Sequence, residues 1–95
     1  MYAVVRRYHS AQLMDELARH EDAIRSLITA IDGFVSYTLA RAADGGYSVS
    51  VYRDRAGAEE STRQAREWVR ANVSPAVGGP PEVSEGDVLF HFDAD

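Results

Sequence analysis

The 95-residue sequence contains no cysteine and no lysine. Without cysteine the chain cannot form disulfides, thiolate nucleophiles, or cysteine-ligated zinc and iron–sulfur sites. Without lysine it cannot use Schiff-base chemistry or the lysine of a phosphate-binding loop. No apolar run approaches the roughly 18 residues of a membrane span, and the short apolar start after Met1 does not resemble a signal peptide. We therefore expect a cytoplasmic protein without a membrane partner.

Basic charge is also scarce in this sequence. Ten arginines stand against 15 acidic residues, which gives a net charge of -5. Proteins that bind DNA or RNA attract its phosphates with positive charge, so we expect no nucleic-acid partner. A chain of this length is expected to form one domain, residues 1–95, with a thin core that self-association would enlarge.

Hydrophobic periodicity predicts four strands and two helices in the order β-α-β-β-α-β. The strands are expected at residues 2–8, 34–41, 47–53 and 87–92, and the helices at residues 10–32 and 56–73. Ser10 and Asp54 are the expected N-caps of the helices, and Asp44-Gly45-Gly46 is typical of a hairpin turn. This order predicts an α+β ferredoxin-like sandwich, in which two helices cover one face of a four-stranded antiparallel sheet.

The other face of such a sheet would be open to solvent. Alternation predicts that this face carries some of a set of apolar side chains, namely Tyr2, Val4, Tyr8, Val49, Tyr52 and Phe90. An exposed apolar surface of this size is typical of an interface. We therefore expect a homodimer in which two sheets pack face to face around a twofold axis.

Hydrolytic and metal chemistry have little support in the sequence. No serine lies in the Gly-x-Ser-x-Gly turn that exposes a nucleophile. The three histidines, His9, His20 and His91, lack the spacing of metal ligands, although His9 and His91 lie on strands that this fold would make neighbours. We expect no metal site and no cofactor.

Four side chains are the candidates for a catalytic site. Trp68 and Asn72 lie four residues apart on the second predicted helix and so share a face, whereas Tyr37 and Tyr52 come from strands. A pocket with such walls suits a flat, partly polar organic ligand, because aromatic rings stack on it and a few donors fix its orientation. The alternative is structural, with Trp68 filling the core and Asn72 binding carbonyl groups at the helix end.

Two joins between elements resemble a known family. They are Ile31-Asp32-Gly33-Phe34-Val35-Ser36-Tyr37, before the second strand, and Val51-Tyr52-Arg53-Asp54-Arg55-Ala56-Gly57-Ala58, before the second helix. Together with the element order, they resemble the antibiotic biosynthesis monooxygenase-like proteins of the dimeric α/β-barrel superfamily. That family typically has Ile-Pro-Gly-Phe at the first join, where this chain has Asp32. The resemblance covers nearly the whole chain and implies a homodimer with facing sheets and a cavity between helices and sheet in each protomer.

Members of this family include cofactor-independent monooxygenases, which act on polyphenolic anthrone-like substrates, and haem-degrading enzymes. The monooxygenases use Asn, Trp, Tyr and Arg side chains to form and stabilise a substrate carbanion that activates oxygen. Trp68 resembles the tryptophan of their second helix, whereas Asn72 has no firm counterpart. Haem-degrading members use an asparagine on the first strand and a histidine near the end of the second helix. This chain has Arg6 and Arg7 on that strand and Asn72-Val73-Ser74-Pro75 at that helix end, so haem degradation is not expected.

Two functions remain open from the sequence. In the first, the protein binds a hydrophobic or aromatic small molecule as a cofactor-independent monooxygenase. Trp68 would then stack on the substrate, and Asn72, Tyr37 or Tyr52 would donate hydrogen bonds to a developing enolate. In the second, the same fold is a non-catalytic ligand-binding or assembly module.

Overall fold

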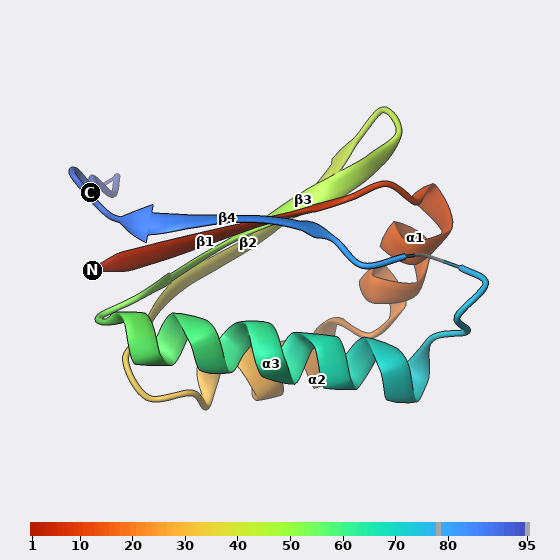
Figure 1. Ribbon diagram of the computed structural model, residues 1–95, viewed down its shortest axis with the longest axis horizontal. Coiled ribbons are helices and arrows are strands. Elements are labelled where there is room, and N and C mark those ends of the chain that lie inside the picture. Colours follow the sequence, from red (N-terminus) through yellow and green to blue (C-terminus); the bar gives the residue numbers. More distant parts are fainter. Residues whose placement is uncertain (78, 95) are drawn as a thin grey trace.

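A computed structural model of the chain describes residues 1–77 and 79–94. Its elements are β1 (Tyr2–Tyr8), α1 (Ala11–Arg19), α2 (Glu21–Thr29), β2 (Phe34–Ala42), β3 (Gly45–Tyr52), α3 (Arg55–Asn72) and β4 (Glu82–Asp87). The strands form one antiparallel sheet in the order β2-β3-β1-β4, and the helices cover one of its faces (Figure 1). The predicted α+β ferredoxin-like fold is confirmed. Among the described residues, no helix is both long and apolar enough to cross a membrane.

The predicted first helix is in fact two helices that meet at His20. Helix α1 begins after Ser10, whose side chain caps the first turn as predicted. At the other end, His20 Nδ1 lies 2.8 Å from the Glu16 carbonyl oxygen, and the His20 N–H bonds the Leu17 carbonyl at 3.1 Å instead. The side chain thus occupies the carbonyl that would accept the next helical hydrogen bond, and α2 starts one residue later. Hydrophobic periodicity did not reveal this break, because the apolar stripe continues across it.

The second predicted helix and the hairpin are confirmed. Helix α3 begins after Asp54, whose carboxylate accepts a hydrogen bond from the Gly57 N–H at 3.0 Å. The turn between β2 and β3 consists of Ala43-Asp44, so both glycines after it belong to β3. Gly45 has a φ of 156°, and a Cβ there would lie 2.1 Å from the Tyr8 carbonyl oxygen. Glycine is therefore required at this position by the close approach of β1.

The predicted last strand, residues 87–92, is wrong. Strand β4 ends at Asp87, which lies opposite Tyr2, the first residue of β1. One further backbone bond follows, from the Val88 N–H to the Met1 carbonyl at 3.0 Å. The alternating apolar residues beyond this point have no paired strand among the described residues, because β1 does not extend alongside them. Three of them, Leu89, Phe90 and Phe92, are between 80% and 87% exposed.

The expected set of side chains on the open face is also wrong. Cross-strand pairs place Val4 opposite Ser50 and Tyr2 opposite Tyr52, and these side chains point toward the helices. Val4, Tyr8 and Tyr52 are accordingly buried. The open face carries the alternate positions instead, and its apolar members include Ala3, Val5, Tyr47, Val49 and Val51. Of the expected set, Val49 alone lies there.

The core between sheet and helices is divided into two apolar clusters. One comprises Val4, Ile28, Ile31, Tyr52 and Ala58, and the other comprises Tyr8, Leu13, Met14, Leu17 and Val73. Arg6 lies on β1 between Val4 and Tyr8 and points to the same side, yet it is only 1% exposed. A charged side chain therefore separates the two halves of the core.

Candidate functional site

The largest described cavity lies between α1, α2 and β2. Its volume is about 510 Å³, and it is open to solvent on one side. The lining residues are Leu17, Ala18, Glu21, Ile24, Arg25, Ile28, Thr29, Phe34, Tyr37 and Leu39. Most of these side chains are apolar, because the helical stripe of α1 and α2 faces the alternating apolar positions of β2. Such a cavity suits a hydrophobic ligand with few polar groups.

Tyr37 supplies the aromatic hydroxyl of this cavity. Burial and, to a smaller extent, the neighbouring Tyr8 raise the pKa of Tyr37 to about 12, although the Arg6 guanidinium opposes the rise. The phenol is therefore protonated throughout the physiological range, where it can donate a hydrogen bond to an oxyanion. Of the four predicted site residues, Tyr37 is the one that lines the large cavity.

Trp68 and Asn72 lie elsewhere, on the side of α3. The Trp68 ring packs edge-to-face against His20, with ring centroids 5.2 Å apart. It lines a separate void of about 20 Å³, which has room for roughly one water molecule. Asn72 is exposed, and its Nδ2 donates a hydrogen bond to the Trp68 carbonyl at 2.9 Å.

Tyr52 is fully buried, and its hydroxyl is used within the fold. It donates a hydrogen bond to the Ile28 carbonyl at 3.1 Å, near the end of α2. The four predicted residues therefore do not converge on one cavity. Glu21 and Arg25 also line the cavity wall, and neither was among the predicted site residues.

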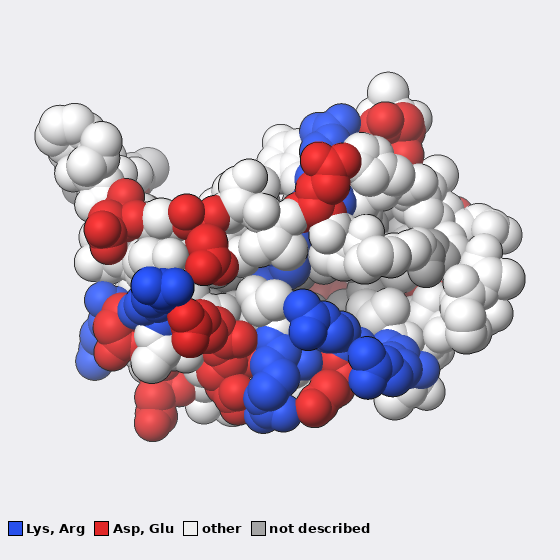
Figure 2. Space-filling view, viewed as in Figure 1, with Lys and Arg blue, Asp and Glu red and all other residues white. Residues whose placement is uncertain are grey.

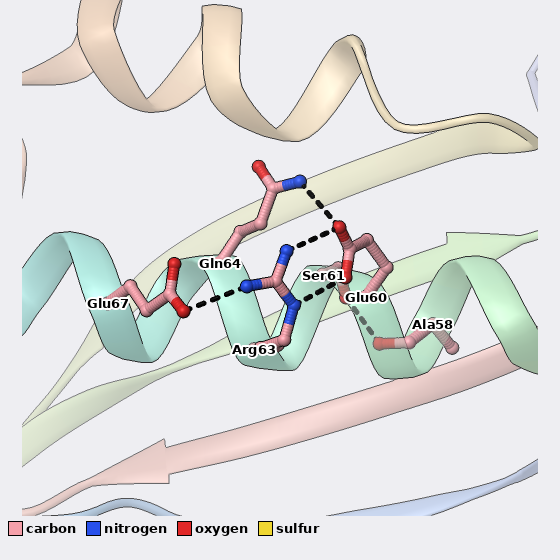
Figure 3. Close-up of polar contacts among 6 residues, drawn as sticks. All are labelled: Ala58, Glu60, Ser61, Arg63, Gln64 and Glu67. Carbon is pink, nitrogen blue, oxygen red and sulfur yellow. Dashed lines mark hydrogen bonds and ion pairs between the residues drawn. The ribbon is translucent and has the colours of Figure 1, made fainter.

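Glu60, Arg63 and Glu67 on α3 form ion pairs with one another (Figure 3). Arg63 Nε donates to Glu60 Oε1 at 2.7 Å, and Arg63 Nη1 donates to Glu67 Oε1 at 2.8 Å. Hydrogen bonds from Arg63 and Gln64 lower the pKa of Glu60 to about 2. On the inner side of the helix, Ser61 Oγ donates to the Ala58 carbonyl at 2.7 Å. We therefore assign no ligand to this ion-paired group.

No histidine that the structure describes lines the large cavity. His9 Nε2 lies 2.6 Å from Glu82 Oε1, whereas His91 pairs with Asp93 beyond the opposite end of β4. The two-histidine site considered from the sequence is therefore not formed. The described residues contain no group of three or more His, Cys, Asp or Glu side chains that could hold a metal ion. Ligation of haem iron by histidine is therefore not available in this cavity.

Neither a family model nor a curated protein matches this sequence. Solved structures do match it over nearly its full length. Rv0793 from Mycobacterium tuberculosis is 28% identical, with a TM-score of 0.68 over 97% of this chain and 98% of its own. SnoaB, a cofactor-independent oxygenase from Streptomyces nogalater, is 18% identical, with a TM-score of 0.69 over 98% of this chain and 97% of its own. The heme-degrader MhuD from Mycobacterium tuberculosis is 14% identical, with a TM-score of 0.70 over 98% of this chain and 100% of its own.

These structures match the present fold across almost all of both chains. The identity of 28% with Rv0793 extends over the same span. The resemblance inferred from the two sequence joins is thereby confirmed. The chain therefore has the fold of the antibiotic biosynthesis monooxygenase-like proteins.

Proposed function

We propose that the protein binds a hydrophobic or aromatic small molecule between α1, α2 and β2 and oxygenates it without a cofactor. The observation that carries this proposal is the cavity of about 510 Å³, whose mostly apolar wall holds the protonated phenol of Tyr37. Its volume lies within the roughly 300–1,000 Å³ of typical small-molecule sites. The fold neighbour SnoaB, described as a cofactor-independent oxygenase, supports the reaction class.

The proposed chemistry needs an acidic C–H group next to a carbonyl, as in an anthrone. Loss of that proton gives an enolate, and the Tyr37 O–H donates a hydrogen bond to its oxygen. Glu21, the carboxylate at the cavity wall, accepts the proton. The enolate then transfers one electron to molecular oxygen, and the resulting radical and superoxide combine to a peroxide. The peroxide takes the proton back from Glu21 and loses water. One oxygen atom ends in the new carbonyl group and the other in water, so the methylene group loses its two hydrogens.

The other predicted residues have positioning roles in this proposal. Trp68 packs on His20, where α1 and α2 meet, and so supports the helical wall of the cavity. Tyr52 fixes the end of α2 through the Ile28 carbonyl. Asn72 donates a hydrogen bond to the Trp68 carbonyl in the last turn of α3. None of these three side chains lines the large cavity.

A non-catalytic binding protein is the second candidate. Tyr52 and Asn72 both donate their side-chain hydrogen bonds to backbone carbonyls, so neither is free to bind a substrate oxygen. Tyr37 is then the one predicted donor at the cavity, which favours the non-catalytic function. In that case the same ligand would bind without consuming oxygen.

We also propose that the protein is a homodimer, with a second copy covering the open face of the sheet. All helices lie on the other face (Figure 1), so the strip around Val5 and Tyr47, which are 37% and 38% exposed, has no cover within the described chain. Phe90 and Phe92 stack 6.1 Å apart in the exposed segment after β4 and would add apolar area to such an interface. A second copy offers the same apolar surface in return, as a twofold interface requires.

Replacement of Tyr37 by phenylalanine tests the oxygenase proposal. Because one donor to the enolate is lost, kcat for oxygen uptake with anthrone should fall about 100-fold, whereas KM should change only a few-fold. An oxygen electrode measures both constants, and Tyr47→Phe on the open face is the matched control. Full activity of Tyr37→Phe would contradict the role of Tyr37. Binding of anthrone by the wild type without oxygen uptake would favour the non-catalytic function.

The raised pKa of Tyr37 also predicts a pH dependence of stability. Between pH 10 and about 12 the unfolded chain loses the Tyr37 proton while the folded chain keeps it, so the free energy of unfolding falls as pH rises. Replacing Tyr37 by phenylalanine should make this fall in the free energy of unfolding less steep by about 1 kcal/mol per pH unit. Burial also raises the pKa of Tyr2 and Tyr52, so part of the slope remains. Urea titrations of wild type and Tyr37→Phe at several pH values measure the difference, and parallel curves would refute the prediction.

Sedimentation at micromolar concentration tests the dimer. The wild type should have twice the 10.5 kDa mass of one chain, and Val5→Glu should sediment as a folded monomer, because it places a charge in the centre of the interface. Ala23→Glu adds the same charge to exposed helix α2 and should leave the mass unchanged. A wild-type mass near 10.5 kDa would rule out the proposed dimer.

A further inference from the structure

We propose that a second cavity, between β1, α3 and the segment after α3, binds a small apolar carboxylate. Its volume is about 260 Å³, and it shares no lining residue with the first cavity. Its lining contains three arginines, Arg6, Arg66 and Arg70, and no aspartate or glutamate. Such a distribution is notable in a chain whose net charge is -5. This proposal is independent of the oxygenase function proposed for the first cavity.

Arg6 is the buried charge of this cavity. Its Nη1 donates to Thr62 Oγ1 at 2.9 Å and lies 3.5 Å from Ser61 Oγ on α3, and its Nη2 donates to Ser50 Oγ at 3.0 Å on β3. These partners are all neutral hydroxyls. Within residues 1–77 and 79–94, Arg6 forms no ion pair with a carboxylate. A guanidinium cannot release its proton under ordinary conditions, so the positive charge remains without a counter-charge.

Two buried polar atoms at this position are also without partners. Arg6 Nε and Ser48 Oγ form no hydrogen bond with the described residues, although Arg6 is 1% exposed and Ser48 is fully buried. Ser48 lies opposite Arg6 in the pairing of β1 with β3. Buried donors are nearly always satisfied in native proteins, so the unpaired Nε–H of Arg6, a residue that lines the cavity, can still take one acceptor. An anionic ligand would supply both the acceptor and the counter-charge.

Arg66 and Arg70 extend the positive charge to the cavity's outer wall. Both are exposed, and neither forms an ion pair with any residue that the structure describes. Figure 2 shows basic side chains gathered over the C-terminal half of α3. Arg63 on the same helix differs from them, because Glu60 and Glu67 both bind it and it does not line the cavity. The unpaired arginines would attract an anion and guide it toward Arg6.

The remaining walls favour a ligand with an apolar body. Tyr8, Leu13, Val69 and Val73 line the cavity, together with three prolines after α3. A free inorganic anion would leave these walls without contacts, whereas a compact aromatic or aliphatic acid would cover them. A carboxylate also matches the planar guanidinium, because its two oxygen atoms can accept parallel hydrogen bonds. The volume, slightly below the typical range for drug-sized ligands, restricts the ligand to a small acid.

Calorimetric titration of the full chain with phenylacetate tests this proposal. Phenylacetate should bind at least ten-fold more tightly than phenylacetamide, its neutral counterpart, and more tightly than inorganic phosphate. Arg66→Ala and Arg70→Ala should each weaken phenylacetate binding several-fold, whereas the matched variant Arg63→Ala should not. Arg6→Gln should abolish binding while circular dichroism shows a folded chain. If Arg6→Gln does not fold, the two surface variants and Arg63→Ala still decide the result.

Three outcomes would overturn the proposal. They are no binding of phenylacetate at millimolar concentration, equal binding of phenylacetate and phenylacetamide, or an equal loss of affinity in Arg63→Ala and Arg66→Ala. Tyr37→Phe should leave phenylacetate affinity unchanged, because Tyr37 does not line this cavity. A loss of affinity in that variant would place the acid in the first cavity instead and would also overturn the proposal. Failure of the oxygenase proposal would leave these measurements unaffected.

Discussion

The burial of Arg6 in the middle of β1 is the constraint on which the rest of the structure depends. A guanidinium in a protein interior needs hydrogen-bond acceptors, and this one has hydroxyl groups from β3 and α3 as its partners. Serines therefore occupy the positions of central strand β3 where a core of this size would otherwise hold larger apolar residues. The resulting polar layer divides the core into two clusters. We interpret the two separate cavities under the helices as a consequence of this division.

The two cavities differ in their electrostatic character. The first has a mostly apolar wall and a protonated phenol, which can stabilise an oxyanion without carrying charge itself. The second has three arginines and no carboxylate. Arg6 also affects the first cavity, because its charge opposes the rise in the pKa of Tyr37.

Most of the fold could be predicted from the sequence, because caps and alternation are local signals. Ser10 and Asp54 both cap helices as expected. The break at His20 could not be predicted, since it depends on one side chain bonding a carbonyl inside an unbroken apolar stripe. The end of β4 depends on where its partner strand begins. Residue types and spacing identified Tyr37. Strand alternation places Arg6 on the same face as Val4 and Tyr8, but it could not show that the guanidinium would be buried without a carboxylate partner.

Nuclear magnetic resonance of the arginine Nε–H groups tests the central claim most directly. If Arg6 is the buried charge of a carboxylate site, its Nε–H should exchange slowly with solvent, because that donor is buried and unpaired in the described structure. Its signal should shift when phenylacetate is added and remain in place when phenylacetamide is added, while the Arg63 signal stays constant with both. An Arg6 Nε–H signal that exchanges as rapidly as that of Arg63 and does not respond to phenylacetate would contradict the account.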